Sequence, residues 1–370
     1  MSWAELHHKS ERLAAEAQAA ARNSPELAQK LYIEAAKLEA EALSDIPPTK
    51  LRTLGVTAIS AVALWFKARC FADAQQLAYR VLAQNGLPQF AVEQMQGLLQ
   101  SIWSEEVRRN AGFKFSEGAL LVSVSGGQSV TGGAPLDLVV SKVEGIQSLF
   151  FRTVEYLQKR PHRKRGPASL DVQNVCRPWL FQAAPGSYQF AIAIEDVAQR
   201  TLFGPEVPTI EEIKTAFVAL LRDAAEDPTT ALAERVPDSD YRGTFLKLTR
   251  ALAPTGKDLS VLTVRRSSTD SDPITLDESS RKTINEVIKQ QFTKPRSTGE
   301  TPGELRGILR GVHLDQDWLE VTVKDQHIRV FGVGEAVDDV VGPLVNRAVV
   351  VAIVTQANGR MLFRDIEAAT

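Results

Sequence analysis

The sequence predicts a multi-domain protein that joins an all-α part to α+β and all-β parts. At 370 residues the chain is too long for one ordinary core. Residues 5–103 are rich in helix formers and carry almost no β signal. Strand and helix patterns then alternate, and the chain closes with five short strand patterns. We therefore expect an α-hairpin array (residues 1–110), a central α/β sheet domain (115–292) and a five-stranded β-barrel (303–370).

The composition is that of an average globular protein. Hydrophobic residues make up 44% and charged residues 24%, which excludes global disorder. The 43 Lys and Arg against 45 Asp and Glu predict no general affinity for polyanions, although a local basic patch remains compatible. The two cysteines, Cys70 and Cys176, favour buried reduced thiols. Neither a secretory leader pattern nor an apolar run of roughly 20 residues is found, so we expect a cytoplasmic protein without a membrane partner.

Helix breakers divide the N-terminal part at regular intervals. They fall at residues 23–25, 47–48 and 85–88, and apolar residues recur between them at helical spacing. Trp65 precedes a run of aromatic, small and apolar positions at Phe71, Ala74, Ala78 and Val81, and the first hairpin repeats this pattern at Ala28, Tyr32 and Ala35.

This pattern resembles the tetratricopeptide repeat, in which small residues let two helices cross closely. The usual glycine is absent, since Val62 stands in its place, and a generic helical bundle is the alternative. The resemblance implies a concave face that binds other proteins, made of Val56, Ile59, Ala63, Phe66 and Lys67. Because this set is mostly apolar, we expect it to accept an apolar helix or another part of this chain.

A glycine-rich loop, residues 126–133, follows the first strand of the central domain. A nucleotide P-loop needs a lysine beside its glycines, and this loop has none. We interpret it as a mobile surface loop. A helix is expected from Leu136 to about Arg160 and further strands at residues 188–194 and 259–264. From about residue 115 onward the chain resembles an uncharacterised bacterial family, through Pro135 to Leu138 and Gly186 to Phe190, which implies a prokaryotic source.

A basic run at residues 159–165 is the strongest electrostatic feature. Together with Arg152 it sets six positive side chains against one acid, Glu155. The favoured interpretation is a solvated helix end, and the alternative is a contact for nucleic acid or for an acidic protein. The basic side chains of the run are Lys159, Arg160, Arg163, Lys164 and Arg165.

The C-terminal pattern is strand, strand, strand, helix, strand, strand. This order predicts an OB-like barrel, with an SH3-like barrel as the rival. Trp318, His327, Arg329 and Phe331 could stack on and attract nucleic acid. Two observations oppose that role: residues 303–370 hold seven Lys and Arg against ten Asp and Glu, and alternation is expected to turn some of these aromatics inward.

Catalytic groups are not recognisable in the sequence. The five histidines form no zinc-binding pair with a third ligand, and no nucleophile elbow occurs. We expect no enzyme activity, cofactor or metal. The leading hypothesis is an adaptor or assembly subunit of a bacterial multi-protein complex that binds partner proteins through its helices. The alternative is a nucleic-acid-binding component, for example of a phage-defence system, that uses the basic run and the barrel.

Overall fold

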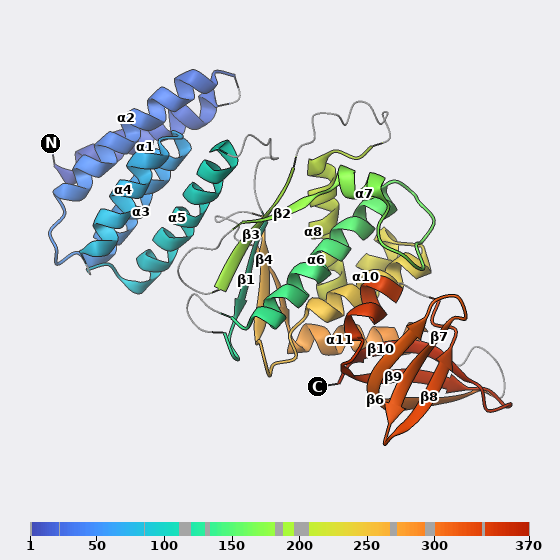
Figure 1. The fold of residues 1–370 in the computed structure, drawn as a ribbon. Helices are drawn as coiled ribbons and strands as arrows, with labels where there is room; N and C mark the ends of the chain where they lie inside the picture. Colours follow the sequence, from blue (N-terminus) through green and yellow to red (C-terminus); the bar gives the residue numbers. More distant parts are fainter. Residues whose placement is uncertain are drawn as a thin grey trace. The chain divides into compact units, whose positions relative to one another are not determined.

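The computed structural model contains an N-terminal helical region and two β-sheets, one of which closes into a barrel (Figure 1). The chain divides into two compact units, Met1–Phe113 with Phe181–Ala191, and Lys114–Leu180 with Ile192–Thr370. The structure describes residues 2–21, 23–84, 86–110, 120–129, 134–181, 188–195, 207–266, 272–292, 300–334 and 337–369.

Five helices form the helical unit. Ser2 begins the first of them with a capping box, in which its hydroxyl accepts the Glu5 N–H and the Glu5 carboxylate accepts the Ser2 N–H. The second helix starts at Pro25, where the missing N–H costs no hydrogen bond. The five are α1 (Trp3–Ala20), α2 (Pro25–Ser44), α3 (Leu51–Lys67), α4 (Phe71–Ala83) and α5 (Gln89–Asn110).

Small residues lie where these helices cross. Ala74 and Ala78 are fully buried against α3, as the sequence pattern predicts. The crossing of α3 and α5 depends on Gly55, because a Cβ built there would lie 2.8 Å from the Cβ of Ala91. Small residues therefore allow close backbone approach at these crossings, while large side chains such as Met95 and Ile102 fill the core between them.

The second unit contains helices and the larger part of a five-stranded sheet, since Phe181–Ala191, which includes the start of β3, is grouped with the first unit. The strand order is β2-β3-β1-β4-β5, and β1, β4 and β5 pair antiparallel, as in an α+β rather than a doubly wound domain. Two short strands, β2 and β5, escape the sequence patterns because each has only four residues. The strands are β1 (Leu120–Ser125), β2 (Pro178–Phe181), β3 (Tyr188–Ile194), β4 (Val261–Arg265) and β5 (Ile274–Asp277).

Helices pack beside this sheet and form a common apolar core with it. At its centre the rings of Phe150 and Phe217 stack with centroids 4.0 Å apart, which joins α6 to α8. The helices are α6 (Leu136–Leu157), α7 (Leu170–Val175), α8 (Ile210–Glu226), α9 (Ala231–Arg235), α10 (Ser239–Leu252) and α11 (Glu278–Phe292).

The C-terminal sheet is a closed barrel with the order β10-β8-β7-β6-β9. Its long first strand pairs antiparallel with both β7 and β9, while β8 and β10 meet in parallel. Two helical turns, η2 (Val337–Val341) and η3 (Gly342–Leu344), connect β8 to β9, where a helix was predicted. The strands are β6 (Thr301–His313), β7 (Trp318–Val323), β8 (Gln326–Phe331), β9 (Ala348–Thr355) and β10 (Met361–Ala368).

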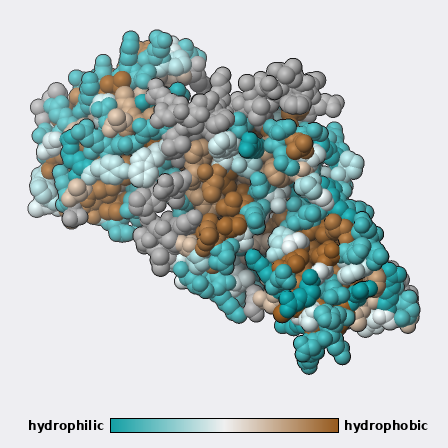
Figure 2. All heavy atoms as spheres, viewed as in Figure 1, coloured by the Kyte–Doolittle hydropathy of each residue, from teal (hydrophilic) through white to brown (hydrophobic). Residues whose placement is uncertain are grey.

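Hydrophobic residues are unevenly distributed over the surface. Figure 2 shows a mostly hydrophilic visible face with hydrophobic patches in the middle of the view and over the C-terminal part. Val345, 37% exposed, follows the helical turns of the barrel. Within the described part of the chain, no helix is both long enough and apolar enough to cross a membrane.

Candidate binding face of the barrel

Cross-strand pairing brings the four predicted barrel residues onto one face. Trp318 lies opposite Phe331, and His327 and Arg329 occupy the positions opposite Thr322 and Glu320. Residues directly opposite each other point to the same side of a sheet. The intervening side chains fill the barrel interior: they are Leu319, Val321 and Val330. The expectation that alternation turns part of the predicted set inward is therefore wrong, and all four lie on the outside.

Two arginines cover the two aromatic rings of this face. The guanidinium of Arg329 lies 4.4 Å from the Trp318 ring centroid, and that of Arg360 lies 4.4 Å from the Phe331 centroid. Such stacks combine cation–π attraction with a flat polar surface. We call Trp318, Arg329, Phe331 and Arg360 the aromatic–cation face.

Sequence reasoning missed Arg360 and one further neighbour, His313. The His313 ring lies 5.2 Å from the Trp318 ring, because the two residues pair across β6 and β7. Arg360 directly follows the turn at Asn358-Gly359 and precedes β10.

Among the described residues, one acid, Glu320, is in contact with cations of this face. Glu320 contacts Nδ1 of His327 at 3.1 Å and Nε of Arg329 at 3.7 Å. His327 and Arg329 nevertheless keep side-chain exposures of 64% and 57%. Two arginines therefore stand against one glutamate, and the local charge of the face is positive although the barrel as a whole is acidic.

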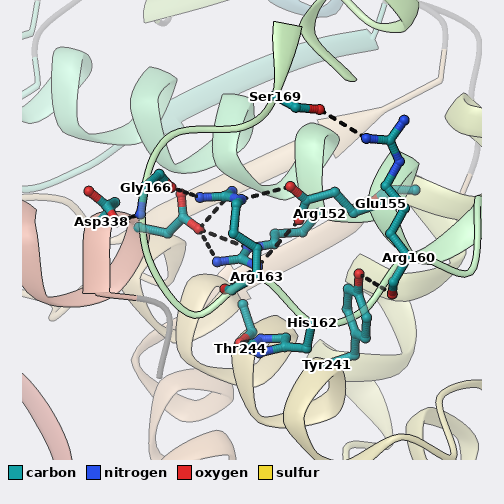
Figure 3. A network of polar contacts seen from close by, with 12 residues as sticks. Arg152, Glu155, Arg160, His162, Arg163, Gly166, Ser169, Tyr241, Thr244 and Asp338 are labelled. Atoms are coloured by element: carbon teal, nitrogen blue, oxygen red, sulfur yellow. Dashed lines mark hydrogen bonds and ion pairs between the residues drawn. The ribbon is translucent and has the colours of Figure 1, made fainter. Parts of the chain in front are cut away.

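The acids of η2 face the α/β part of the same unit. Asp339 accepts hydrogen bonds from Nε of Arg152 at 2.8 Å and from Nη2 of Arg163 at 3.2 Å. Arg163 also donates to Glu155 at 2.7 Å, and Asp338 accepts the Gly166 N–H at 2.5 Å. Figure 3 shows how Arg152, Glu155 and Arg163 converge. These five side chains form the first charge cluster, and Arg152 is completely buried in it.

A second charge cluster lies at β10. Asp365 and Arg250 form a two-pronged ion pair, and Arg250 also donates to the Ile366 carbonyl at 2.7 Å. Nearby, Arg281 contacts the Glu367 carboxylate at 3.1 Å. Burial tends to raise the pKa of Asp365, but the positive charges of Arg250 and Lys247 outweigh burial and lower it. The carboxylate is therefore held ionised inside the protein.

These clusters change how the charge of the barrel must be counted. Five of its acids contact groups outside the barrel: Asp317, Asp338, Asp339, Asp365 and Glu367. The acid excess read from the sequence is thus largely directed at the neighbouring α/β part. It does not describe the field at the aromatic–cation face, so this objection to an anionic ligand weakens.

The basic run supplies much of the opposing charge. Arg163 belongs to the first charge cluster, Arg165 pairs with Asp317 at 2.9 Å, and Arg160 donates to the Ser169 hydroxyl at 2.9 Å. Lys159 and Lys164 are exposed. Two of the five basic side chains, Arg163 and Arg165, therefore pair with acids of the chain's own barrel, while Arg160 contacts Asp171 at 3.6 Å.

The predicted face of the helical unit lies along α3. Val56 is 48% exposed, whereas Ile59, Ala63 and Phe66 are half-buried against the unit's own core. Lys67 is exposed, with its ammonium group 5.7 Å from the Tyr32 ring centroid. The two ends of this face are thus the most open to a partner.

The described start of the glycine-rich loop is tightly packed. Gly126 and Gly127 have φ of +74° and +63°, and a Cβ on Gly127 would lie 2.3 Å from the Asp258 carbonyl oxygen. Gln128 also donates its backbone N–H to that oxygen at 2.8 Å. These glycines serve a close turn at an exposed position, so the surface location that we expected is found for the start of the loop. Residues 130–133 lie outside the described part.

Among the described residues, no group of three or more His, Cys, Asp or Glu is arranged to hold a metal ion. Comparison with known proteins found no match to this chain among family models, curated proteins or solved structures.

Proposed function

We propose that this protein is a non-enzymatic binding protein that holds single-stranded nucleic acid on the aromatic–cation face of an OB-type barrel. The strand connections support the OB type over an SH3-like barrel. The first strand pairs with the second and fourth, a helical segment precedes the fourth, and the third and fifth run parallel. The second and third strands of such a barrel commonly form its binding face.

The observation that carries this proposal is the pair of arginine-covered rings. Bases stack on aromatic rings and on guanidinium planes with little sequence preference, and each stack contributes roughly 1–3 kcal/mol. Trp318 and Phe331 lie on neighbouring strands, so two successive bases could use them together. Arg329 and Arg360 supply positive charge for the phosphates.

Fluorescence anisotropy with a labelled oligo-dT strand tests the proposal. Trp318→Ala should weaken binding by roughly 5- to 100-fold, because one stacked base is lost. Arg329→Ala should weaken binding and lower the slope of log affinity against log salt by about one. Arg12→Ala is the charge-matched control, since Arg12 is 70% exposed on α1 of the other unit. Absence of binding at low salt, or equal binding by all variants, would contradict the proposal.

A second candidate is an adaptor of a bacterial multi-protein complex that acts through tetratricopeptide-like hairpins. The supporting observation is a set of exposed apolar residues on α3, α4 and α5: Leu51, Val56, Tyr79 and Phe90. Such residues are typical of protein-binding surfaces. This role and a cytoplasmic location, including a place in phage defence, are compatible with nucleic-acid binding by the barrel.

Affinity purification from the native host, with and without nuclease, separates the two candidates. Partner proteins that survive nuclease and are lost with Val56→Asp would support the adaptor. Partners that disappear with nuclease would instead indicate that nucleic acid links them to this chain.

A further inference from the structure

Asp317 connects three parts of the protein just before Trp318. Its carboxylate accepts the Gly334 N–H at 2.9 Å and contacts Nη2 of Arg165 at 2.9 Å. Its carbonyl accepts the Gly332 N–H at 2.8 Å. The turn between β6 and β7 is thereby tied to the segment after β8 and to the basic run.

The same turn fixes the Trp318 ring. The Trp318 indole N–H donates to the Gln316 side chain at 3.0 Å, and the Gln316 backbone N–H donates to Nδ1 of His313 at 3.1 Å. His313 in turn lies against the Trp318 ring. Phe331, which pairs with Trp318, directly precedes the segment that Asp317 holds. A shift of Asp317 would therefore change the positions of both aromatic rings, Trp318 and Phe331.

We infer that Arg165 is a positioning residue for the aromatic–cation face, acting through Asp317 rather than by contact with nucleic acid. Its guanidinium is directed to the Asp317 carboxylate, and both side chains are only partly exposed, at 38% and 37%. This inference rests on the proposed function. It also assigns the end of the basic run a role that sequence reasoning could not separate from phosphate binding.

Two single variants remove this ion pair with little other change. Asp317 has φ of +54°, a conformation that asparagine adopts readily. Asp317→Asn can still accept the Gly334 N–H, so mainly the charge pair is lost. Arg165→Gln removes the same pair from the other side, and Arg165→Lys keeps the charge as a conservative rescue.

The oligo-dT anisotropy assay should give the same result for both variants. Because exposed ion pairs contribute about 0.2–1 kcal/mol, each should weaken binding up to about fivefold. The salt slope should stay unchanged, since Arg165 does not neutralise a phosphate. The double variant should bind no more weakly than either single variant, because both remove one interaction. Arg165→Lys should recover part of the loss.

A different pattern would overturn the inference. If Arg165→Gln lowers the salt slope by about one while Asp317→Asn tightens binding, Arg165 contacts phosphate directly. If Trp318→Ala weakens binding but neither ion-pair variant does, Arg165 has no positioning role, while the proposed function still holds. If Trp318→Ala has no effect, the proposed function fails and this inference fails with it.

Discussion

The helical unit and the two charge clusters are held together mainly by different means. In the hairpins, fully buried alanines such as Ala17, Ala35 and Ala78 bring helices together, and the buried Glu39 carboxylate, which contacts Nδ1 of His7 at 2.9 Å, adds one polar contact between α1 and α2. In the clusters, Arg152 and Arg250 are buried with carboxylates as partners. Apolar packing is non-directional and tolerates small shifts, whereas a buried ion pair is favourable only in one geometry.

This difference has a consequence for the barrel. The charge clusters fix one orientation between the barrel and the α/β part, at the cost of desolvating several ions. They also direct four acids of the barrel toward the α/β part: Asp338, Asp339, Asp365 and Glu367. We therefore expect variants in the clusters to act through uncompensated charge, and variants in the hairpins to act through volume.

The largest effect is expected at the second charge cluster. Asp365→Ala leaves Arg250 buried without its main partner and should lower the free energy of unfolding by about 3–5 kcal/mol, measured by urea denaturation. Glu304→Ala, which removes a 45%-exposed barrel carboxylate, is the matched control and should change little. Replacing both partners, as in Arg250→Met with Asp365→Leu, should restore most of the loss. A double variant as unstable as Asp365→Ala would contradict the uncompensated-charge account.

A smaller effect is expected on acidification. The pKa of Asp365 is lowered in the folded state, so the unfolded state takes up the proton at higher pH. The stabilisation is complete above the unfolded pKa of about 3.9 and is lost as the pH falls through the lower, folded value. Urea denaturation in acid should therefore show a steeper loss of stability in the unmodified protein than in the Arg250→Met, Asp365→Leu variant. Parallel profiles would show that Asp365 does not contribute.

The sequence predicts what is local in this fold. Breakers and helical periodicity indicated the helices of the first unit, and the strand order indicated a closed barrel. The contacts of the basic run were not predictable, because Arg152 and its partner Asp339 are 187 positions apart. The sequence therefore predicted a solvated helix end for Arg152 and gave no indication of its partner.

The register of β7 and β8 shows a second limit. Their turn, Lys324-Asp325, has positive φ at both residues, +47° and +65°. In a sequence, such a turn is usually indicated by an Asn-Gly or Asp-Gly pair, and neither pair is present here. Without that signal, the sequence did not predict that Trp318 pairs with Phe331. It also did not predict on which side of the sheet these two residues lie.

The smallest effect is expected in the hairpins, where a matched pair within α1 isolates packing. Ala17 is fully buried and Ala15 is exposed. Leucine and alanine have similar helix propensities, so Ala15→Leu should change the free energy of unfolding by less than about 0.5 kcal/mol. Ala17→Leu forces extra methyl groups into a filled core and should cost about 1–3 kcal/mol. Thermal denaturation followed by circular dichroism measures both. Equal stability of the two variants would mean that the hairpin core is loosely packed, and the contrast with the charge clusters would then rest on the ions alone.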